Sequence, residues 1–199
     1  MPNARTKRMA APERRTQLLR AARKAFGRNG FHGVSMEEVA REAGITKPIL
    51  YDHFSSKQDL YLALLEADSA ALGERVHTAL VDGSGNRERI RQSFQAYFDF
   101  VDEHAEGFRL FMQETQSPER VSSGVAKVRE RILEEVASVI VRESKGQIDP
   151  DDADTVAVGL VGMVEAGAQR NPGGQKSERD RQVDALVRLA WTGIAALTP

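Results

Sequence analysis

Hydrophobic residues recur at helical spacing along almost the whole chain, and no useful length shows the strict alternation of a β-strand. The first run covers residues 12–29 and ends at Gly30, and a longer one runs from Ser56 to about Val81. Further runs lie near residues 90–101, 108–112, 124–145, 150–169 and 177–197, beyond a breaking loop at residues 82–86. The pattern predicts an all-α protein of about nine helices.

Residues 34–54 have the pattern of two short helices joined by a tight turn. Ser35 and Glu38 have the spacing of a capping box at the start of the first helix. Gly44 suits the left-handed conformation that ends a helix, and Thr46 takes the N-cap position of the next. Pro48 falls in the first turn, where its missing N–H removes no intrahelical bond. The segment predicts a helix-turn-helix, completed as a three-helix unit by residues 12–29.

The charge of the chain is unevenly distributed. Residues 1–57 hold 12 lysines and arginines against 5 aspartates and glutamates, whereas residues 58–199 hold 16 against 24. A solvated charged face would explain such a block equally well by charge alone. Because the basic block coincides with the two-helix motif, we interpret it as a surface for DNA phosphates. We expect a DNA-binding domain over residues 1–57 and a ligand-binding and dimerisation domain over residues 58–199.

The composition limits which classes of protein the chain can belong to. The 199 residues are 41% hydrophobic, enough for a packed core, and include no cysteine, which suits a reducing cytoplasm. The longest apolar stretch, residues 156–164, is too short to span a membrane. We therefore expect a cytoplasmic protein without a membrane partner.

The helix-turn-helix resembles that of the TetR family of bacterial transcriptional regulators. The similarity is carried by Val-Ala-Arg-Glu-Ala-Gly-Ile-Thr-Lys-Pro over residues 39–48 and Leu-Tyr-x-His-Phe-x-Ser-Lys-x-x-Leu over residues 50–60. Beyond residue 65 it rests on the order of helices. The resemblance implies a homodimeric regulator, more often a repressor than an activator, whose C-terminal domain binds a small molecule and changes the spacing of the two DNA-binding heads.

Carried onto this sequence, the family pattern and groove geometry indicate three contact residues at the start of the second short helix. Lys47 can donate to guanine or phosphate, Pro48 can touch a thymine methyl group, and Tyr51 can contact phosphate or a base edge. Four further residues match backbone-contact positions or helix N-termini: Ser35, Thr46, His53 and Lys57. Ile49 and Asp52 depart from the usual pattern, which leaves the preferred bases open. The basic arm, residues 1–11, can reach the minor groove or be disordered.

The later helices supply the expected effector and dimer surfaces. Candidate ligand contacts are mostly aromatic, although such a stripe is more often core than pocket: Tyr61, Phe94, Tyr97, Phe98, His104, Phe108, Phe111, Met112 and Gln113. Helices near residues 150–171 and 177–197 carry apolar stripes, so two from each subunit predict a four-helix dimer interface. Gly159 and Gly162 suggest close approach of another helix there. An ordinary monomer core is the alternative.

Enzymatic interpretations lack support in the sequence. The four histidines are scattered without metal-ligand spacing, and no convergent polar constellation is evident. We expect no catalytic residue, metal or cofactor. The chain is best explained as a regulator that binds double-stranded operator DNA and an unidentified small-molecule effector. The alternative is a helical small-molecule-binding protein without sequence-specific DNA recognition.

Overall fold

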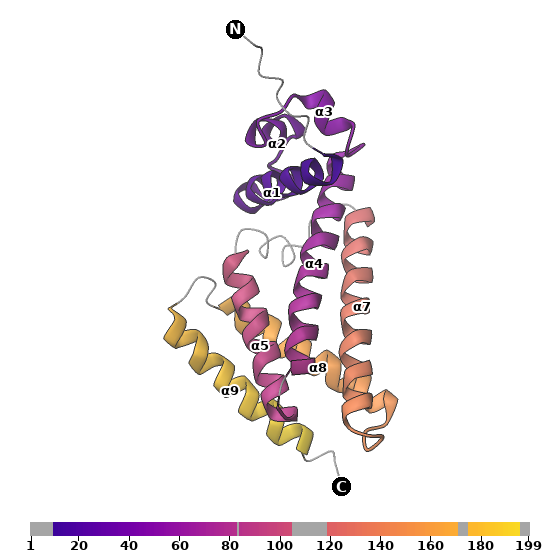
Figure 1. The fold of residues 1–199 in the computed structure, drawn as a ribbon, viewed down its shortest axis with the longest axis vertical. Coiled ribbons are helices and arrows are strands. Elements are labelled where there is room, and N and C mark those ends of the chain that lie inside the picture. The colour runs from indigo at the N-terminus through magenta and orange to yellow at the C-terminus, as the bar shows by residue number, and fades with distance from the viewer. Residues whose placement is uncertain (1–9, 83, 105–118, 171–174, 196–199) are drawn as a thin grey trace. The chain divides into compact units, whose positions relative to one another are not determined.

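The computed structural model describes residues 10–82, 84–104, 119–170 and 175–195 (Figure 1). Within these ranges all regular structure is helical and no strand occurs, which confirms the all-α prediction. The chain divides into two compact units. Of the described residues, the first unit contains 10–65 and 119–122, and the second contains 66–82, 84–104, 123–170 and 175–195.

The first unit is built from α1 (Ala11–Asn29), α2 (Met36–Glu42), α3 (Lys47–Tyr51) and the beginning of α4 (Lys57–Asp82). α2 packs against both α1 and α3. The core contains apolar side chains from all four helices and the loops between them: Leu18, Ala22, Phe26, Phe31, Val34, Val39, Leu50, Phe54, Leu60 and Tyr61. Burial of this shared face explains why the short helices α2 and α3 are stable here, since short helices are marginal alone.

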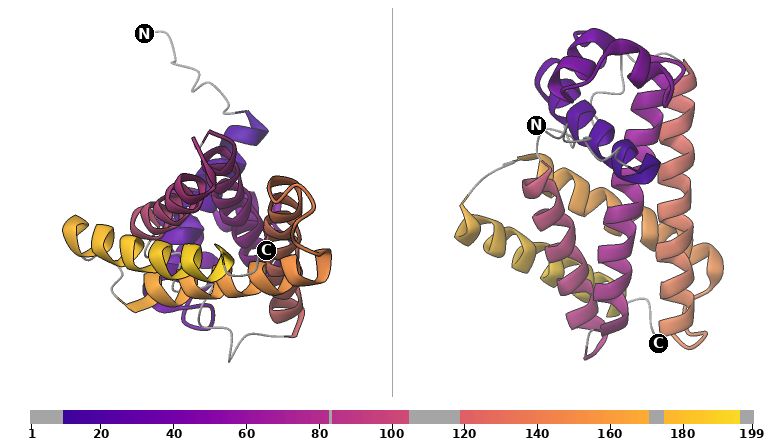
Figure 2. Two further views of the ribbon diagram at one scale, coloured as in Figure 1. Left: turned by 90° about the horizontal axis from the view of Figure 1, so that it is seen from below. Right: turned by 45° about the horizontal axis from the view of Figure 1, so that its top comes forward.

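The second unit contains the rest of α4 and most of α7 (Glu119–Glu143), together with α5 (Asn86–Glu103), α8 (Pro150–Arg170) and α9 (Lys176–Ala195). α5 lies beside α9, and α8 contacts both, as the views in Figures 1 and 2 show. Gly167 permits this packing, because a Cβ there would lie 2.9 Å from Cδ1 of Leu186 on α9 and 3.1 Å from Cζ of Phe98 on α5. The glycine therefore has a steric role that its helix propensity does not reveal.

Ion pairs link neighbouring helices of the second unit. Nη2 of Arg129 on α7 lies 2.6 Å from Oε2 of Glu165 on α8. Arg179 on α9 contacts Asp102 on α5, which ties these two helices together. Asp102, Glu165 and Arg179 are all less than a quarter exposed, so these pairs help to fix which helix faces meet.

Several helix boundaries follow from local caps. Oγ of Ser56 accepts a hydrogen bond from the Asp59 amide at the start of α4, and Oδ1 of Asp149 accepts one from the Asp151 amide at the start of α8. α7 corrects one expectation, because it begins at Glu119, whereas the helical run was expected to begin near residue 124. Low helix propensity near Gly124 costs only about 1 kcal/mol per glycine and does not end the helix. The basic arm and the expected helix near residues 108–112 lie outside the described residues, apart from residues 10 and 11 of the arm.

Candidate functional site

The first helix of the motif begins at a reciprocal cap. The Glu38 amide donates to Oγ of Ser35 at 3.2 Å, and the Ser35 amide donates to Oε2 of Glu38 at 2.7 Å. The Ser35 amide and hydroxyl hold the pKa of the Glu38 carboxyl below its usual value, because both hydrogen bonds favour the charged form. The capping box is confirmed, and it uses the Ser35 hydroxyl that was also a candidate phosphate donor.

The turn between α2 and α3 is held by backbone and side-chain hydrogen bonds. Gly44 has φ +67°, the left-handed conformation predicted for it. The Ile45 amide then donates to the Ala40 carbonyl at 3.0 Å, and Nε2 of Gln17 on α1 donates to the Ala43 carbonyl at 2.9 Å. The C-terminal carbonyls of α2 are thus used within the unit, which fixes the direction in which α3 leaves the turn.

α3 presents one anchored side chain and several exposed ones. Leu50 is fully buried, whereas Lys47, Pro48 and Tyr51 are exposed, with Tyr51 at 43%. Burial of Leu50 on one side leaves the beginning of the helix on the surface of the unit. Thr46 has extended backbone at the N-cap position, as predicted, but its side chain makes no capping hydrogen bond. The expectation of a side-chain cap at Thr46 was therefore wrong.

Lys47 forms an ion pair that sequence reasoning missed. Its ammonium group contacts the carboxylate of Glu37 on α2, and both side chains are exposed. The pairing raises the pKa of Lys47 and lowers the pKa of Glu37, because each charge favours the other. The same ammonium lies 5.8 Å from the centroid of the Tyr51 ring. Lys47, Tyr51 and Glu37 thus form one exposed cluster, but no local spacing rule connects residues ten positions apart on two helices.

Lys57 makes its contacts within the first unit. Nζ of Lys57 donates to the carbonyls of Phe31 and Val34, at 2.9 Å each, and lies 4.6 Å from the centroid of the Phe31 ring. These contacts close the loop between α1 and α2 against the start of α4. Contact between Lys57 and the DNA backbone stays a prediction, and in this structure the ammonium has a structural use.

His53 lies just after α3 and is half-buried, and its amide donates to the Leu50 carbonyl at 3.1 Å. The guanidinium of Arg15 lies 4.6 Å from the centroid of the adjacent Phe54 ring, which brings a further cation of α1 to this end of α3. Arg15 was not among the predicted contacts. Its place on the basic first helix was the signal available, but the pattern of α1 alone does not show which arginine meets α3.

The predicted ligand contacts that the structure describes belong to both units. Tyr61 is 2% exposed and packs edge-on against Phe26 and Phe31, with ring centroids 5.2 and 5.1 Å away, so its environment is the aromatic core of the first unit. That core role corrects our grouping of Tyr61 with the residues of α5. Phe108, Phe111, Met112 and Gln113 lie outside the described residues.

The remaining ligand candidates are on α5 or directly after it. Phe94 and Phe98 are buried, and Tyr97 is half-buried. Burial raises the pKa of the Tyr97 hydroxyl well above its usual value, because the phenolate would lose hydration. His104 ends the helix, where its ring stacks on Phe100 with centroids 4.2 Å apart and Nδ1 lies 3.0 Å from the Phe100 carbonyl. These positions support a packed, largely apolar interior of the second unit.

Other classes of site find no support in the parts of the chain that the structure describes. Over residues 10–82, 84–104, 119–170 and 175–195, no three metal-binding side chains come together. A search of the same residues finds no helix with the length and apolarity needed to cross a membrane.

Comparisons with known proteins agree with the helix-turn-helix geometry. Residues 18–64 match the model of bacterial regulatory proteins of the tetR family, and residues 86–193 match a tetracyclin repressor-like C-terminal domain. The chain is 35% identical over 195 residues to the HTH-type transcriptional activator FasR of Mycolicibacterium smegmatis, covering 97% of this chain and 88% of FasR.

Solved structures extend the likeness over the whole fold. A TetR-like transcriptional regulator from Rhodococcus sp. RHA1 is 32% identical with a TM-score of 0.75, covering 94% of this chain and 99% of that one. AibR, solved in complex with isovaleryl coenzyme A and operator DNA, is 20% identical with a TM-score of 0.70, covering 88% and 97% of the two chains. On this evidence the chain belongs to the TetR family of bacterial transcriptional regulators.

Proposed function

We propose that this regulator acts as a homodimeric repressor that binds a two-fold symmetric operator and is released from it by a small-molecule effector. The observation that carries the proposal is the arrangement of α3, in which buried Leu50 anchors the helix while Lys47, Pro48 and Tyr51 are exposed at its beginning. A helix held in this way can enter the major groove with its N-terminal residues toward the base edges.

The individual contacts differ in how well the structure supports them. Lys47 and Tyr51 have free access to solvent, which suits contact with a base or phosphate. Thr46 is exposed and its hydroxyl makes no capping bond, so it supports donation to phosphate better than the Ser35 hydroxyl, which is used in a cap. We therefore assign Lys47, Pro48 and Tyr51 to base readout and Thr46 and His53 to backbone contact.

The Glu37–Lys47 pair supplies a specific test of this assignment. DNA phosphates or a guanine must replace Glu37 as the partner of Lys47, because one ammonium cannot be fully shared with an adjacent carboxylate. Glu37→Gln should therefore raise affinity for the operator. Glu42→Gln is the matched control, since it removes one negative charge from the same helix but leaves the Lys47 pair intact. Equal gains in both variants would show only a general charge effect.

Selection and sequencing of DNA fragments bound by the purified protein at moderate salt tests operator recognition directly. We expect an enriched two-fold symmetric motif with half-sites about one helical turn apart. The motif should disappear for the Lys47→Ala, Tyr51→Ala double variant and persist for Lys24→Ala. Weak, salt-sensitive binding with no enriched motif would refute the proposal and favour a ligand-binding protein without sequence-specific recognition.

The dimer proposal is supported by an open surface on α8 and α9. A Cβ added at Gly159 or Gly162 would meet no atom of the described structure within 4 Å, so none of the described helices provides the close approach suggested for these glycines. Val158 beside them is 54% exposed, and Leu189 on α9 is 63% exposed. A second copy of the same surface would cover these groups in a two-fold interface.

The effector proposal places a small molecule in the second unit, where it shifts the dimer toward a state whose two recognition helices no longer match the operator. Because AibR was solved with isovaleryl coenzyme A and operator DNA, acyl-coenzyme A thioesters of different chain length are the first probes. Fluorescence anisotropy of labelled operator should show release by one chain-length class and none by coenzyme A alone. An operator affinity unchanged by every ligand shown to bind would contradict this part of the proposal.

Activation is the second candidate for the sign of regulation, because FasR, 35% identical to this chain, is named as an activator. In vitro transcription from a promoter that carries the selected motif distinguishes the two signs. Added protein lowers transcript yield if it is a repressor and raises it if it is an activator.

A further inference from the structure

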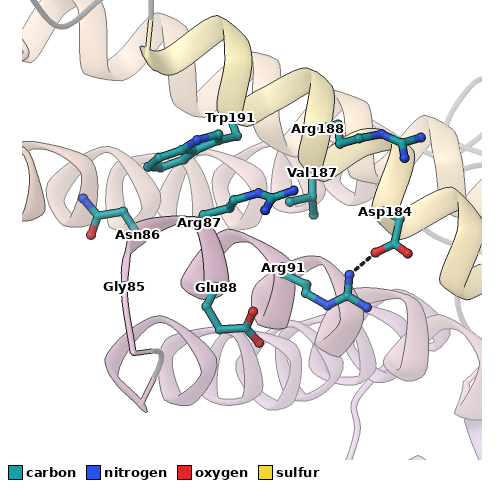
Figure 3. A pocket seen from close by; sticks show the side chains of 9 residues that line it. All are labelled: Gly85, Asn86, Arg87, Glu88, Arg91, Asp184, Val187, Arg188 and Trp191. Carbon is teal, nitrogen blue, oxygen red and sulfur yellow. Dashed lines mark hydrogen bonds and ion pairs between the residues drawn. The ribbon is translucent and has the colours of Figure 1, made fainter.

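A cavity of about 710 Å³ lies between the N-terminal turn of α5 and the C-terminal half of α9, wholly within the second unit. Its size is in the range of about 300–1,000 Å³ typical of small-molecule sites. Figure 3 shows Trp191 of α9 opposite Asn86 and Arg87 of α5. The buried aromatic residues of α5 are not part of its lining. The cavity is therefore distinct from the apolar interior considered for the effector.

The charges around the cavity are unequally matched. Among its lining residues, Arg91 forms an ion pair with Asp184, which links α5 to α9. The Glu88 carboxylate accepts a hydrogen bond from Gln92 at 3.1 Å. Arg87 and Arg188 also line the cavity, and the described structure gives neither of them an anionic partner. The two guanidinium groups therefore remain available to a ligand, and their planar forks suit the oxygen atoms of phosphate.

The indole of Trp191 adds an apolar, planar surface to this charged cavity. Its side chain is half-buried, so one part is held by the protein while another faces the cavity. Indole rings stack favourably on other flat rings and on cations. α5 begins at Asn86, and its N-cap residue Gly85, which also lines the cavity, has no side chain to cap the first amides of the helix. The positive end of the helix dipole consequently reinforces the preference for an anion, in addition to the two arginines.

We propose that this cavity binds a small ligand that joins a flat aromatic ring to a phosphate group, the chemistry of a mononucleotide. The ring stacks on Trp191, and the phosphate is held by Arg87 and Arg188. Two arginines without an anionic partner favour a phosphate dianion over a single carboxylate, since the second guanidinium then also gains a charged acceptor. The site is independent of the proposed effector and operator functions.

Trp191 is the sole tryptophan of the chain, so its fluorescence reports on this cavity directly. Titration of the purified protein with AMP should change the emission in a saturable way, whereas adenosine and inorganic phosphate, each lacking one half of the proposed ligand, should bind much more weakly. Salicylate tests an aromatic carboxylate. Binding of salicylate or inorganic phosphate as tight as that of AMP would overturn the assignment, as would an emission that does not respond to AMP.

Charge variants test which residues hold the phosphate. Arg87→Gln and Arg188→Gln should each weaken AMP binding by about tenfold, the usual effect of losing a hydrogen bond between charged groups. Arg131→Gln, which removes an exposed arginine from α7, is the matched control and should leave binding unchanged. Calorimetry with Trp191→Phe, which keeps a stacking ring, and Trp191→Ala checks the ring contact without fluorescence. Equal AMP affinity of the arginine variants and the control would refute the site.

Discussion

Replacement of Lys57 by methionine tests whether this residue stabilises the DNA-binding unit or contacts DNA. Methionine keeps an unbranched stem of similar length but removes the ammonium group. That group donates to the carbonyls of Phe31 and Val34 at 2.9 Å each and lies over the Phe31 ring. The substitution therefore leaves two carbonyl groups of the loop between α1 and α2 without their donor, at a position that is half-buried.

The expected loss follows from these contacts. A hydrogen bond that involves a charged group contributes about 1.5–3 kcal/mol, and the lower value applies because a half-buried loop carbonyl can regain water. Two such bonds amount to about 3 kcal/mol, and we expect about 2–3 kcal/mol after partial rehydration and retained packing of the stem. Since about 1.4 kcal/mol corresponds to a factor of ten, opening of the first unit becomes about 30- to 160-fold more frequent.

Hydrogen exchange followed by mass spectrometry measures this effect locally. Peptides from α1 and α2 should lose protection by that factor, while peptides from α8 and α9 serve as an internal reference. Lys24→Met is the matched control, since Lys24 is an exposed cation on α1 whose ammonium lies 3.9 Å from Glu42, beyond hydrogen-bond distance. We expect it to change protection little.

The salt dependence of operator binding tests the alternative, in which Lys57 contacts DNA. If Lys57 contacts a phosphate, Lys57→Met should lower the slope of log affinity against log salt by about 1. If its role is structural, the slope stays unchanged while protection in α1 and α2 falls. Normal protection together with a reduced slope would refute our structural interpretation of Lys57.

Three further predictions concern local contacts and assembly. Glu38→Gln should remove a pH dependence of α2 protection. The pKa of Glu38 is lowered in the folded protein, so its stabilising contribution is fully present above the ordinary value of 4.5 and is lost as the pH falls through the lower folded pKa. Hydrogen exchange at several pH values checks this. Gly33→Ala should destabilise the first unit by about 1–3 kcal/mol, because a Cβ would lie 2.3 Å from the Asn29 carbonyl oxygen. Urea unfolding followed by circular dichroism measures this, and an unchanged unfolding midpoint would show that the contact is easily relieved. Val158→Arg should convert a dimer to monomers in sedimentation experiments, and an unchanged mass would place the interface elsewhere.

The helix-turn-helix was predictable because its determinants are close together in the chain. The Ser35–Glu38 capping box joins residues three positions apart, and Gly44 ends its helix through its own backbone conformation. Leu50 is buried and Lys47 is exposed, and this contrast also follows from the helical repeat of α3. Such features need no knowledge of the neighbouring elements.

The site could not be completed in the same way. The sequence indicated that Lys47 is a candidate DNA contact, but its pairing with Glu37 depends on how α2 crosses α3. An aromatic stripe suggested Tyr61 as a ligand contact, and tertiary packing instead places it between Phe26 and Phe31. Hydrophobic periodicity identifies the buried face of a helix but not what covers it, so core and pocket look alike.

The sequence by itself therefore determined the helical class, the Ser35–Glu38 capping box, the glycine turn and the basic character of the first unit, because each depends on neighbouring residues or on summed composition. Tertiary structure decided that Lys57 donates to carbonyls more than twenty positions away, and that Trp191 and the arginines of α5 line one cavity. These contacts form between segments distant in the chain. Their geometry is set by the crossing of packed helices, which side-chain spacing along one helix does not specify.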